Sequence, residues 1–264
     1  MRYSITILIT FFLISCKLKN TQENKDVTSE IPLVKKVQNY CGDNGDYIVE
    51  SEYTYDEKKR IKQSSFINFK NNTNGEIEKI YSQTNKPNVY TYYSDSIVIY
   101  MNDTWERLIL DDNNLFVKSE SPNSFSETKE ITNRIKQTYD NDGYMIKKIV
   151  FNDYITYFDE RVYEYKYANG NLIKEIVTQN HNGSKNSYFI EYEYYEDKLN
   201  TLGNLSFGKA FLGKSSRNLI KRTNGSRNYI TDYKYEFDSL GNVSKMKLLN
   251  NDKIIETFIY QYYN

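Results

Sequence analysis

The sequence lacks most of the residues on which common enzyme chemistries depend. Histidine occurs once, as His181, and cysteine twice, as Cys16 and Cys41. A histidine-based triad needs an orienting carboxylate and a nucleophile, and zinc sites need clusters of Cys and His. His181 precedes Asn182-Gly183, which is typical of an exposed hairpin tip. We therefore expect no catalytic residue, no metal site and no cofactor.

The sequence also has few prolines and no net charge. Three prolines in 264 residues permit long paired strands, because proline cannot donate a hydrogen bond to a β-ladder. The 35 basic and 35 acidic residues cancel, so no overall field attracts nucleic acid, and we expect no nucleic-acid partner. The apolar run at 5–14 falls well short of the roughly 20 residues that a membrane-spanning helix requires.

The N-terminus has the parts of a bacterial export signal. A basic start, Met1-Arg2, is followed by the apolar run at 5–14 and then by Ser15-Cys16. Leu13-Ile14-Ser15-Cys16 resembles the lipobox, in which a small residue precedes the lipid-modified cysteine. We expect residues 1–15 to be a lipoprotein signal peptide and Cys16 to carry the lipid. The alternative is an ordinary signal peptide beside a chance cysteine.

The residues after the expected cleavage point bear on localisation. Anchoring by two or more acyl chains is stable, so Cys16 would tie the protein to a membrane. Lys17-Leu18-Lys19-Asn20 contains neither an Asp directly after Cys16 nor an acidic cluster. By resemblance to lipoprotein sorting rules, this favours the periplasmic face of the outer membrane. With Cys16 lipidated, Cys41 has no partner for a disulfide.

The rest of the chain divides into a tether and one β-rich domain. Residues 16–30 are polar and predict a flexible tether, and residues 31–264 predict a single all-β domain. Tyrosine occurs 27 times, and Tyr163, Tyr165 and Tyr167 alternate with polar residues. Similar alternation occurs at 188–194, 233–237 and 258–262. A period of two with one polar face is typical of antiparallel strands with one solvated side.

Turn residues connect these strands. Six of the eleven glycines follow Asn or Asp, as tight hairpins require: Gly45, Gly75, Gly143, Gly170, Gly183 and Gly225. A strand, an Asp- or Asn-containing turn and a returning strand recur near Asp56, Asp140, Gly170 and Asp238. These segments resemble tyrosine–aspartate (YD) repeats, although their spacing is irregular. Together they predict an antiparallel meander of hairpins that forms a strongly curved sheet or barrel-like fold.

One segment interrupts the meander. Residues 199–222 contain Gly203, Gly208 and Gly213 among apolar side chains. Such a segment is too long for a hairpin loop and too apolar to remain in solvent. We expect a plug-like insertion that covers an open end of the sheet, with a ligand-binding loop as the alternative.

The C-terminal part resembles a known family. Phe207-Gly208-Lys209, the run from Gly213 to Ile220 and the segment from Tyr233 to Val243 are similar to Gram-negative lipoprotein domains of unassigned function, described as having a porin-like fold. The resemblance covers residues 191–264. It implies a curved or closed antiparallel sheet and transfers no catalytic residue. Insertion as a membrane pore is not expected, because alternate strand positions such as Glu164, Lys166 and Lys234 are charged.

These observations support three hypotheses on function. The leading one is a lipid-anchored, non-catalytic binding or scaffolding module that contacts envelope polysaccharide, peptide or a protein partner through exposed tyrosines, especially those of the C-terminal strands, or through the sheet mouth. The alternative is an envelope hydrolase that uses paired carboxylates. Asp111-Asp112 and Asp140-Asn141-Asp142, however, are in turn-like sequence, where Asp binds backbone N–H groups. The third hypothesis is a structural spacer.

Overall fold

A computed structural model describes residues 31–41, 47–71, 77–80, 86–122, 131–153, 158–226 and 229–263. The expected signal peptide, Cys16 and the expected tether lie outside the described residues, as do Gly45 and Gly75. Residues Ile31–Asn264 form one compact unit.

The described chain consists almost entirely of antiparallel strands. Their bounds are β1 Val34–Cys41, β2 Tyr47–Tyr55, β3 Ile61–Asn71, β4 Ile77–Ile80, β5 Asn88–Tyr92, β6 Ser96–Met101, β7 Thr104–Leu110, β8 Phe116–Pro122, β9 Ile131–Tyr139, β10 Met145–Asp153, β11 Phe158–Ala168, β12 Asn171–His181, β13 Ser184–Leu199, β14 Asn218–Gly225, β15 Ile230–Phe237, β16 Val243–Asn250 and β17 Lys253–Tyr262. Strands that are consecutive in sequence pair with each other, except at β4 and β5, which both pair with β3.

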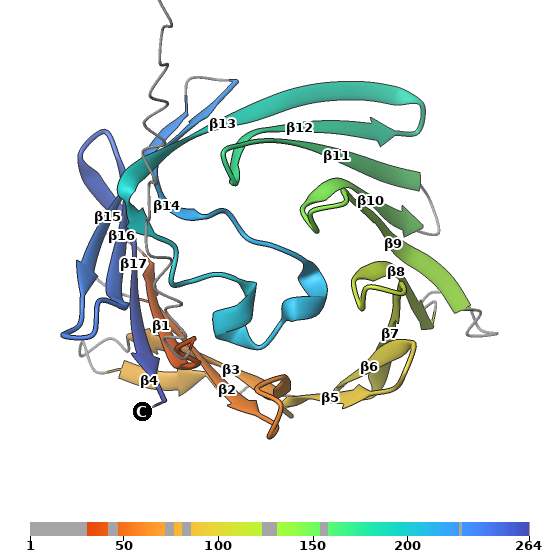
Figure 1. Cartoon of the computed structure of the whole chain (residues 1–264), viewed down its shortest axis with the longest axis horizontal. Helices are drawn as coiled ribbons and strands as arrows, with labels where there is room; N and C mark the ends of the chain where they lie inside the picture. The colour runs from red at the N-terminus through yellow and green to blue at the C-terminus, as the bar shows by residue number, and fades with distance from the viewer. Residues whose placement is uncertain are drawn as a thin grey trace, which may run out of the picture. The chain divides into compact units, whose positions relative to one another are not determined.

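The sheet closes on itself, because β1 pairs with both β2 and β17. Strands β4 and β5 both pair along β3, at opposite ends of it, and so occupy one position in the wall. The result is a closed barrel of 16 antiparallel strands, which Figure 1 shows as a ring. The predicted all-β, barrel-like meander is confirmed.

The predicted insertion fills part of the barrel. β13 ends at Leu199 and β14 begins at Asn218, so the irregular segment is residues 200–217, here called the plug. It is shorter than the predicted 199–222, because residues from Asn218 onward pair with β13. Figure 1 shows the plug inside the ring. It contains two short 3-10 helices, Asn204–Phe207 and Ala210–Leu212.

The helices of the described residues are short, and none has the length and apolarity to cross a membrane.

Contacts with the plug identify the inner face of the wall. Tyr53 packs edge-on against Phe207 of the plug, with ring centroids 5.4 Å apart. The Tyr55 hydroxyl lies 3.4 Å from the Ser206 carbonyl oxygen. Since successive side chains of a strand point to opposite faces, Tyr53 and Tyr55 point inward and Glu52 outward. Cross-strand register carries this assignment around the barrel.

Four hairpins at the plugged end share one turn geometry. Their first residues are Asp56, Asp111, Asp140 and Asp238, and in each the Oδ1 atom accepts hydrogen bonds from the backbone N–H groups two and four residues later. The fourth residue has a positive φ, as in Gly143 and Gly241. This is the role that aspartate plays in turns generally.

One predicted turn is wrong. Asn224-Gly225 has the composition of a tight hairpin turn, but Gly225 ends β14. Its N–H donates to the Tyr229 carbonyl at 3.0 Å, so a longer loop connects β14 to β15.

Candidate functional site

The plug is fixed to hairpin turns around the barrel. Its Gly208 carbonyl accepts a hydrogen bond from the Ile61 N–H at 3.0 Å. The Lys214 N–H donates to the Gly143 carbonyl at 2.9 Å, and the Arg217 N–H donates to the Gly170 carbonyl at 2.9 Å. These bonds join one segment to three separate hairpins, so the plug is an integral part of this end of the barrel.

Two plug glycines are required by close approach of backbone. A Cβ atom on Gly208 would lie 2.6 Å from the Ile61 nitrogen, and one on Gly213 would lie 2.6 Å from the Gly143 oxygen. Both residues also have a positive φ, of +63° and +77°. Only glycine combines this conformation with so little space.

Tyrosines on the inner wall bond to backbone through their hydroxyl groups. Tyr55 donates to the Val34 carbonyl at 2.6 Å, Tyr235 to the Ile220 carbonyl at 2.9 Å and Tyr262 to the Val243 carbonyl at 2.8 Å. Burial raises the pKa of each of these hydroxyls. The C-terminal tyrosines, expected to form an exposed binding face, instead pack inside the barrel, because their face of each strand points inward.

An open groove lies on the outer wall over β6 and β7. Tyr92, at the end of β5, donates to the Ile61 carbonyl and so points inward; its cross-strand partner Ile97 is buried. The alternate residues of β6, Val98 and Tyr100, therefore point outward. The groove has a volume of about 590 Å³ and is lined by Tyr93, Ser94, Asp95, Ser96, Val98, Tyr100, Trp105 and Arg107.

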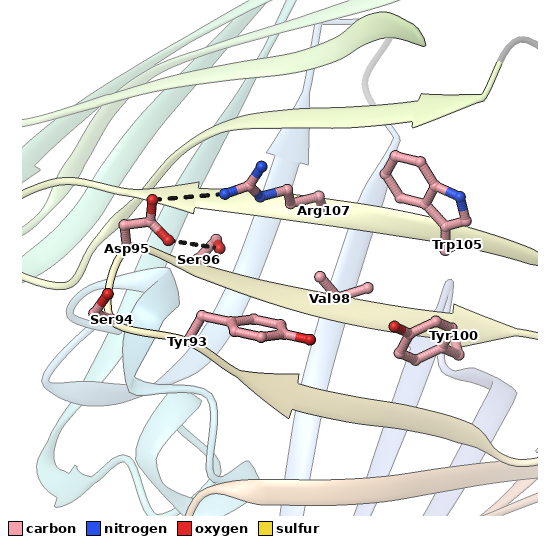
Figure 2. A pocket seen from close by; sticks show the side chains of 8 residues that line it. All are labelled: Tyr93, Ser94, Asp95, Ser96, Val98, Tyr100, Trp105 and Arg107. Atoms are coloured by element: carbon pink, nitrogen blue, oxygen red, sulfur yellow. Dashed lines mark hydrogen bonds and ion pairs between the residues drawn. The ribbon is translucent and has the colours of Figure 1, made fainter.

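Aromatic rings border the groove and remain accessible. Figure 2 shows Tyr93 and Tyr100 on one side of Val98, and Trp105 and Arg107 on the other. Tyr93 is 53% exposed and Tyr100 is 46% exposed. Trp105, the only tryptophan of the chain, is the cross-strand partner of Tyr100. The groove thus offers ring faces to a ligand from solvent.

One end of the groove is polar. The Arg107 Nη2 atom lies 3.5 Å from the Asp95 Oδ2 atom, and the Ser96 hydroxyl donates to Asp95 Oδ1 at 2.8 Å. Backbone bonds fix this corner, since the Tyr93 N–H donates to the Ser96 carbonyl and the Leu110 N–H to the Asp95 carbonyl. The ion pair supplies both hydrogen-bond donors and acceptors beside the rings.

Elsewhere the outer wall carries ion pairs. They are Lys36–Glu50, Lys36–Glu52, Lys118–Glu120, Lys174–Glu191, Arg222–Asp232, Lys245–Glu236 and Lys247–Glu236, with N–O distances of 2.6 to 3.4 Å. Their hydrogen bonds lower the pKa of Asp232 and of Glu236. The uncharged outward residues of β6 are an exception to this pattern.

The candidate residues His181, Asp111 and Asp140 are not among those that line this groove. His181 ends β12 and is exposed beside the Asn182-Gly183 turn. Asp111 and Asp140 are turn residues, as their sequence context suggested. Sequence reasoning missed the groove. The available signal was the segment from Ser96 to Leu110. The residues of this hairpin that share a face with Tyr100 include the single tryptophan and only one charged residue.

A hydrolase or a metal-dependent activity would need clustered carboxylates or metal ligands. In the described part of the chain, no three His, Cys, Asp or Glu side chains gather as metal ligands would. Glu175, which points inward on β12, has a pKa raised by burial, and it accepts a hydrogen bond from the Tyr192 hydroxyl at 3.2 Å. The pKa of Glu175 thus shifts in the direction opposite to those of Asp56, Asp232 and Glu236, which are lowered.

Comparison with known proteins identifies the fold. No family model matches the sequence, and no curated protein matches it. A porin-like protein from Bacteroides uniformis ATCC 8492 superimposes with a TM-score of 0.53 and 13% identity, over 87% of this chain and 96% of that chain. A porin-like protein from Bacteroides vulgatus ATCC 8482 superimposes with a TM-score of 0.52 and 15% identity, over 88% of this chain and 99% of that chain. The chain therefore has the fold of these porin-like barrels.

Proposed function

We propose that this protein is a lipid-anchored, non-catalytic module of the bacterial envelope that binds polysaccharide in the groove over β6 and β7. The single observation that carries the proposal is the set of rings formed by exposed Tyr93 and Tyr100 and half-buried Trp105, beside the Asp95–Arg107 ion pair. Ligand sites typically combine aromatic side chains with a few polar groups in a concave surface.

The chemistry of the groove fits a sugar chain better than a purely apolar ligand. Sugar rings present C–H faces that pack on aromatic rings, and hydroxyl groups that both donate and accept hydrogen bonds. Trp105 and Tyr100 would supply the apolar contact. Arg107 would donate to ligand hydroxyls and Asp95 would accept from them, and each already has a partner that holds it in place.

The outer wall supports a location beside a membrane and in water. A lysine or arginine that faces the bilayer midplane costs about 2–4 kcal/mol. Lys174, Arg222 and Lys247 lie on the outer wall, where a membrane-inserted barrel would turn them toward lipid at a cost that increases toward the midplane. We infer that the protein is held at the periplasmic face of the outer membrane by lipid on Cys16, with its wall in solvent.

A hydrolase remains the second candidate, and Glu175 is the observation that favours it. A general acid needs a raised pKa, and burial gives Glu175 that property. Glycoside hydrolysis needs a second carboxylate at a defined separation. The groups that influence Glu175 are Tyr192 and Lys148, neither of which is a carboxylate. Glu175→Gln is therefore the variant that separates hydrolysis from binding.

The proposal is tested by binding to purified cell-wall sacculi and to soluble envelope polysaccharide. Wild-type protein is expected to sediment with sacculi or to be retarded in gels that contain polysaccharide. Trp105→Ala should reduce the affinity at least about tenfold, which corresponds to about 1.4 kcal/mol.

The matched control is Tyr229→Ala, which removes an exposed tyrosine of the β14–β15 loop outside the groove. Its affinity should equal that of wild type. Equal loss in both variants, or binding that Trp105→Ala leaves intact, contradicts the proposal. Product release from polysaccharide that Glu175→Gln abolishes would establish the hydrolase instead.

A further inference from the structure

Exposed apolar side chains gather at one sector of the plugged end. Leu240, at the tip of the β15–β16 turn, is 84% exposed; Leu199, which ends β13, is 62% exposed; and Leu205, in the plug, is 52% exposed. Phe237, Tyr263 and Ile31 are exposed near the ends of β15, β17 and β1. Single exposed apolar residues are ordinary on a protein surface, so these six form an apolar patch only if they are neighbours.

A hydrogen bond and a ring contact connect the strands and the plug in this sector. The Val243 N–H, three residues after Leu240, donates to the Thr201 hydroxyl, two residues after Leu199. Lys198 extends over the Phe237 ring at 5.8 Å. The turn after β15, the end of β13 and the start of the plug therefore adjoin.

Contacts also connect the residues of this sector that lie near the two ends of the described chain. Tyr55 packs edge-on against Tyr263, with ring centroids 5.9 Å apart, and its hydroxyl lies 3.4 Å from the carbonyl oxygen of Ser206, next to Leu205. The Tyr263 N–H donates to the Leu33 carbonyl, two residues from Ile31. We call the set of Ile31, Leu199, Leu205, Phe237, Leu240 and Tyr263 the apolar rim.

Two charged residues of this sector, Asp238 and Lys198, are held by contacts within the protein. The Asp238 carboxylate accepts three hydrogen bonds inside its own turn. The Lys198 ammonium lies 4.2 Å from the centre of the Tyr195 ring, with its stem along apolar surface. Lysine in this position can extend its charge to the lipid headgroups while its stem stays apolar.

The chain enters the barrel at this rim, and this identifies the partner. Ile31 is the first described residue, and the 30 residues before it hold the expected lipid site. A flexible tether of residues 16–30 would span on average about 20 Å. It would keep the rim close to the bilayer and the opposite end of the barrel away from it.

We propose that the apolar rim docks on the surface of a phospholipid bilayer, so that the plugged end faces the membrane and the β14–β15 loop faces away. The orientation rests on the lipid anchor of the proposed function, whereas the docking of the rim can be measured separately. Because the six side chains of the rim carry no charge, docking requires no anionic lipid.

Brominated lipids in zwitterionic phosphatidylcholine vesicles test the rim. Bromine on the acyl chains quenches tryptophan only at short range, and the full-length protein offers one native tryptophan, Trp105, distant from the rim on the outer wall. Three proteins are compared: wild type, Trp105→Phe with Leu240→Trp, and Trp105→Phe with Tyr229→Trp as the matched control at the opposite end. Only the tryptophan at 240 should lose most of its fluorescence.

The failure of the rim and the failure of the anchor give different results. If the protein carries lipid and remains on vesicles but tryptophan at 240 is not quenched, the inference is overturned. An unquenched protein that sediments as a dimer assigns the rim to a second copy and also overturns it. If Cys16 carries no lipid but tryptophan at 240 is quenched, the anchor fails and the rim is supported.

Discussion

The interior of the barrel and the groove on its outer wall are both rich in tyrosine, but they use it differently. Inside, Tyr235 is largely buried, contacts the Tyr195 ring at 6.0 Å and donates its hydroxyl to the Ile220 carbonyl. In the groove, Tyr100 exposes nearly half its surface beside Trp105. The comparison shows that the number of tyrosines carries little information on binding, since position relative to the closed wall decides the role of each ring.

The largest expected difference between the two regions is in stability. Tyr235→Ala should lower the free energy of unfolding by about 4 kcal/mol, because it leaves a cavity among buried rings and an unpaired carbonyl. Tyr100→Ala should change it by less than about 0.5 kcal/mol, as for other surface sites. Chemical denaturation of both variants measures the difference. Equal stability losses would mean that the groove is part of the core.

The plug offers a second way to sharpen the comparison. Gly208→Ala should destabilise the protein by about 3 kcal/mol, because the new Cβ meets the Ile61 backbone and the residue keeps a positive φ. Gly241→Ala is the matched control, with a φ of +84° and open space around its Cβ position. It should cost about 1 kcal/mol. Thermal unfolding of the two variants separates the cost of the positive φ, which both share, from the cost of the steric collision, which only Gly208→Ala has.

The smallest effect concerns the turn against which Gly208 packs. Burial by itself would raise the pKa of Asp56, but hydrogen bonds from Arg60 bring it below its ordinary value. A lowered folded-state pKa contributes stability above the unfolded-state pKa of about 3.9, and this contribution is lost as the pH falls through the folded-state pKa.

Asp56→Asn keeps an oxygen acceptor for the turn but removes the charge. At pH 7 it should destabilise the protein by about 1 kcal/mol, and the difference from wild type should vanish at low pH. Unfolding measured at pH 7 and below pH 3 checks this. A difference that persists unchanged in acid would assign the effect to the shape of the side chain and not to its ionisation.

Much of the fold could be predicted from local rules. Alternation at Tyr163, Tyr165 and Tyr167 defines one inner face, and the aspartate turns at Asp56 and Asp140 use hydrogen bonds within five residues. Such signals are short-range and therefore visible in sequence. Closure of the barrel cannot be predicted from such local signals, because it depends on β1 pairing with β17, more than two hundred residues away.

The groove could not be predicted in the same way. Its residues alternate like those of any strand, and a sequence does not say which alternate face of a Tyr-rich strand points to solvent. Tyr235 and Tyr100 therefore look alike until closure is known. In the structure, the contact between the plug and Tyr53 identifies which face of the wall is inside.

Hydroxyl-radical footprinting read by mass spectrometry tests the central claim most directly. Envelope polysaccharide at saturating concentration should protect Tyr93, Tyr100 and Trp105 from oxidation. Tyr229, exposed in the β14–β15 loop, and Tyr188, exposed on the inward face of β13, should react as in the free protein. Protection of Tyr188 with an unprotected groove, or no protection at any of these residues, would contradict the account.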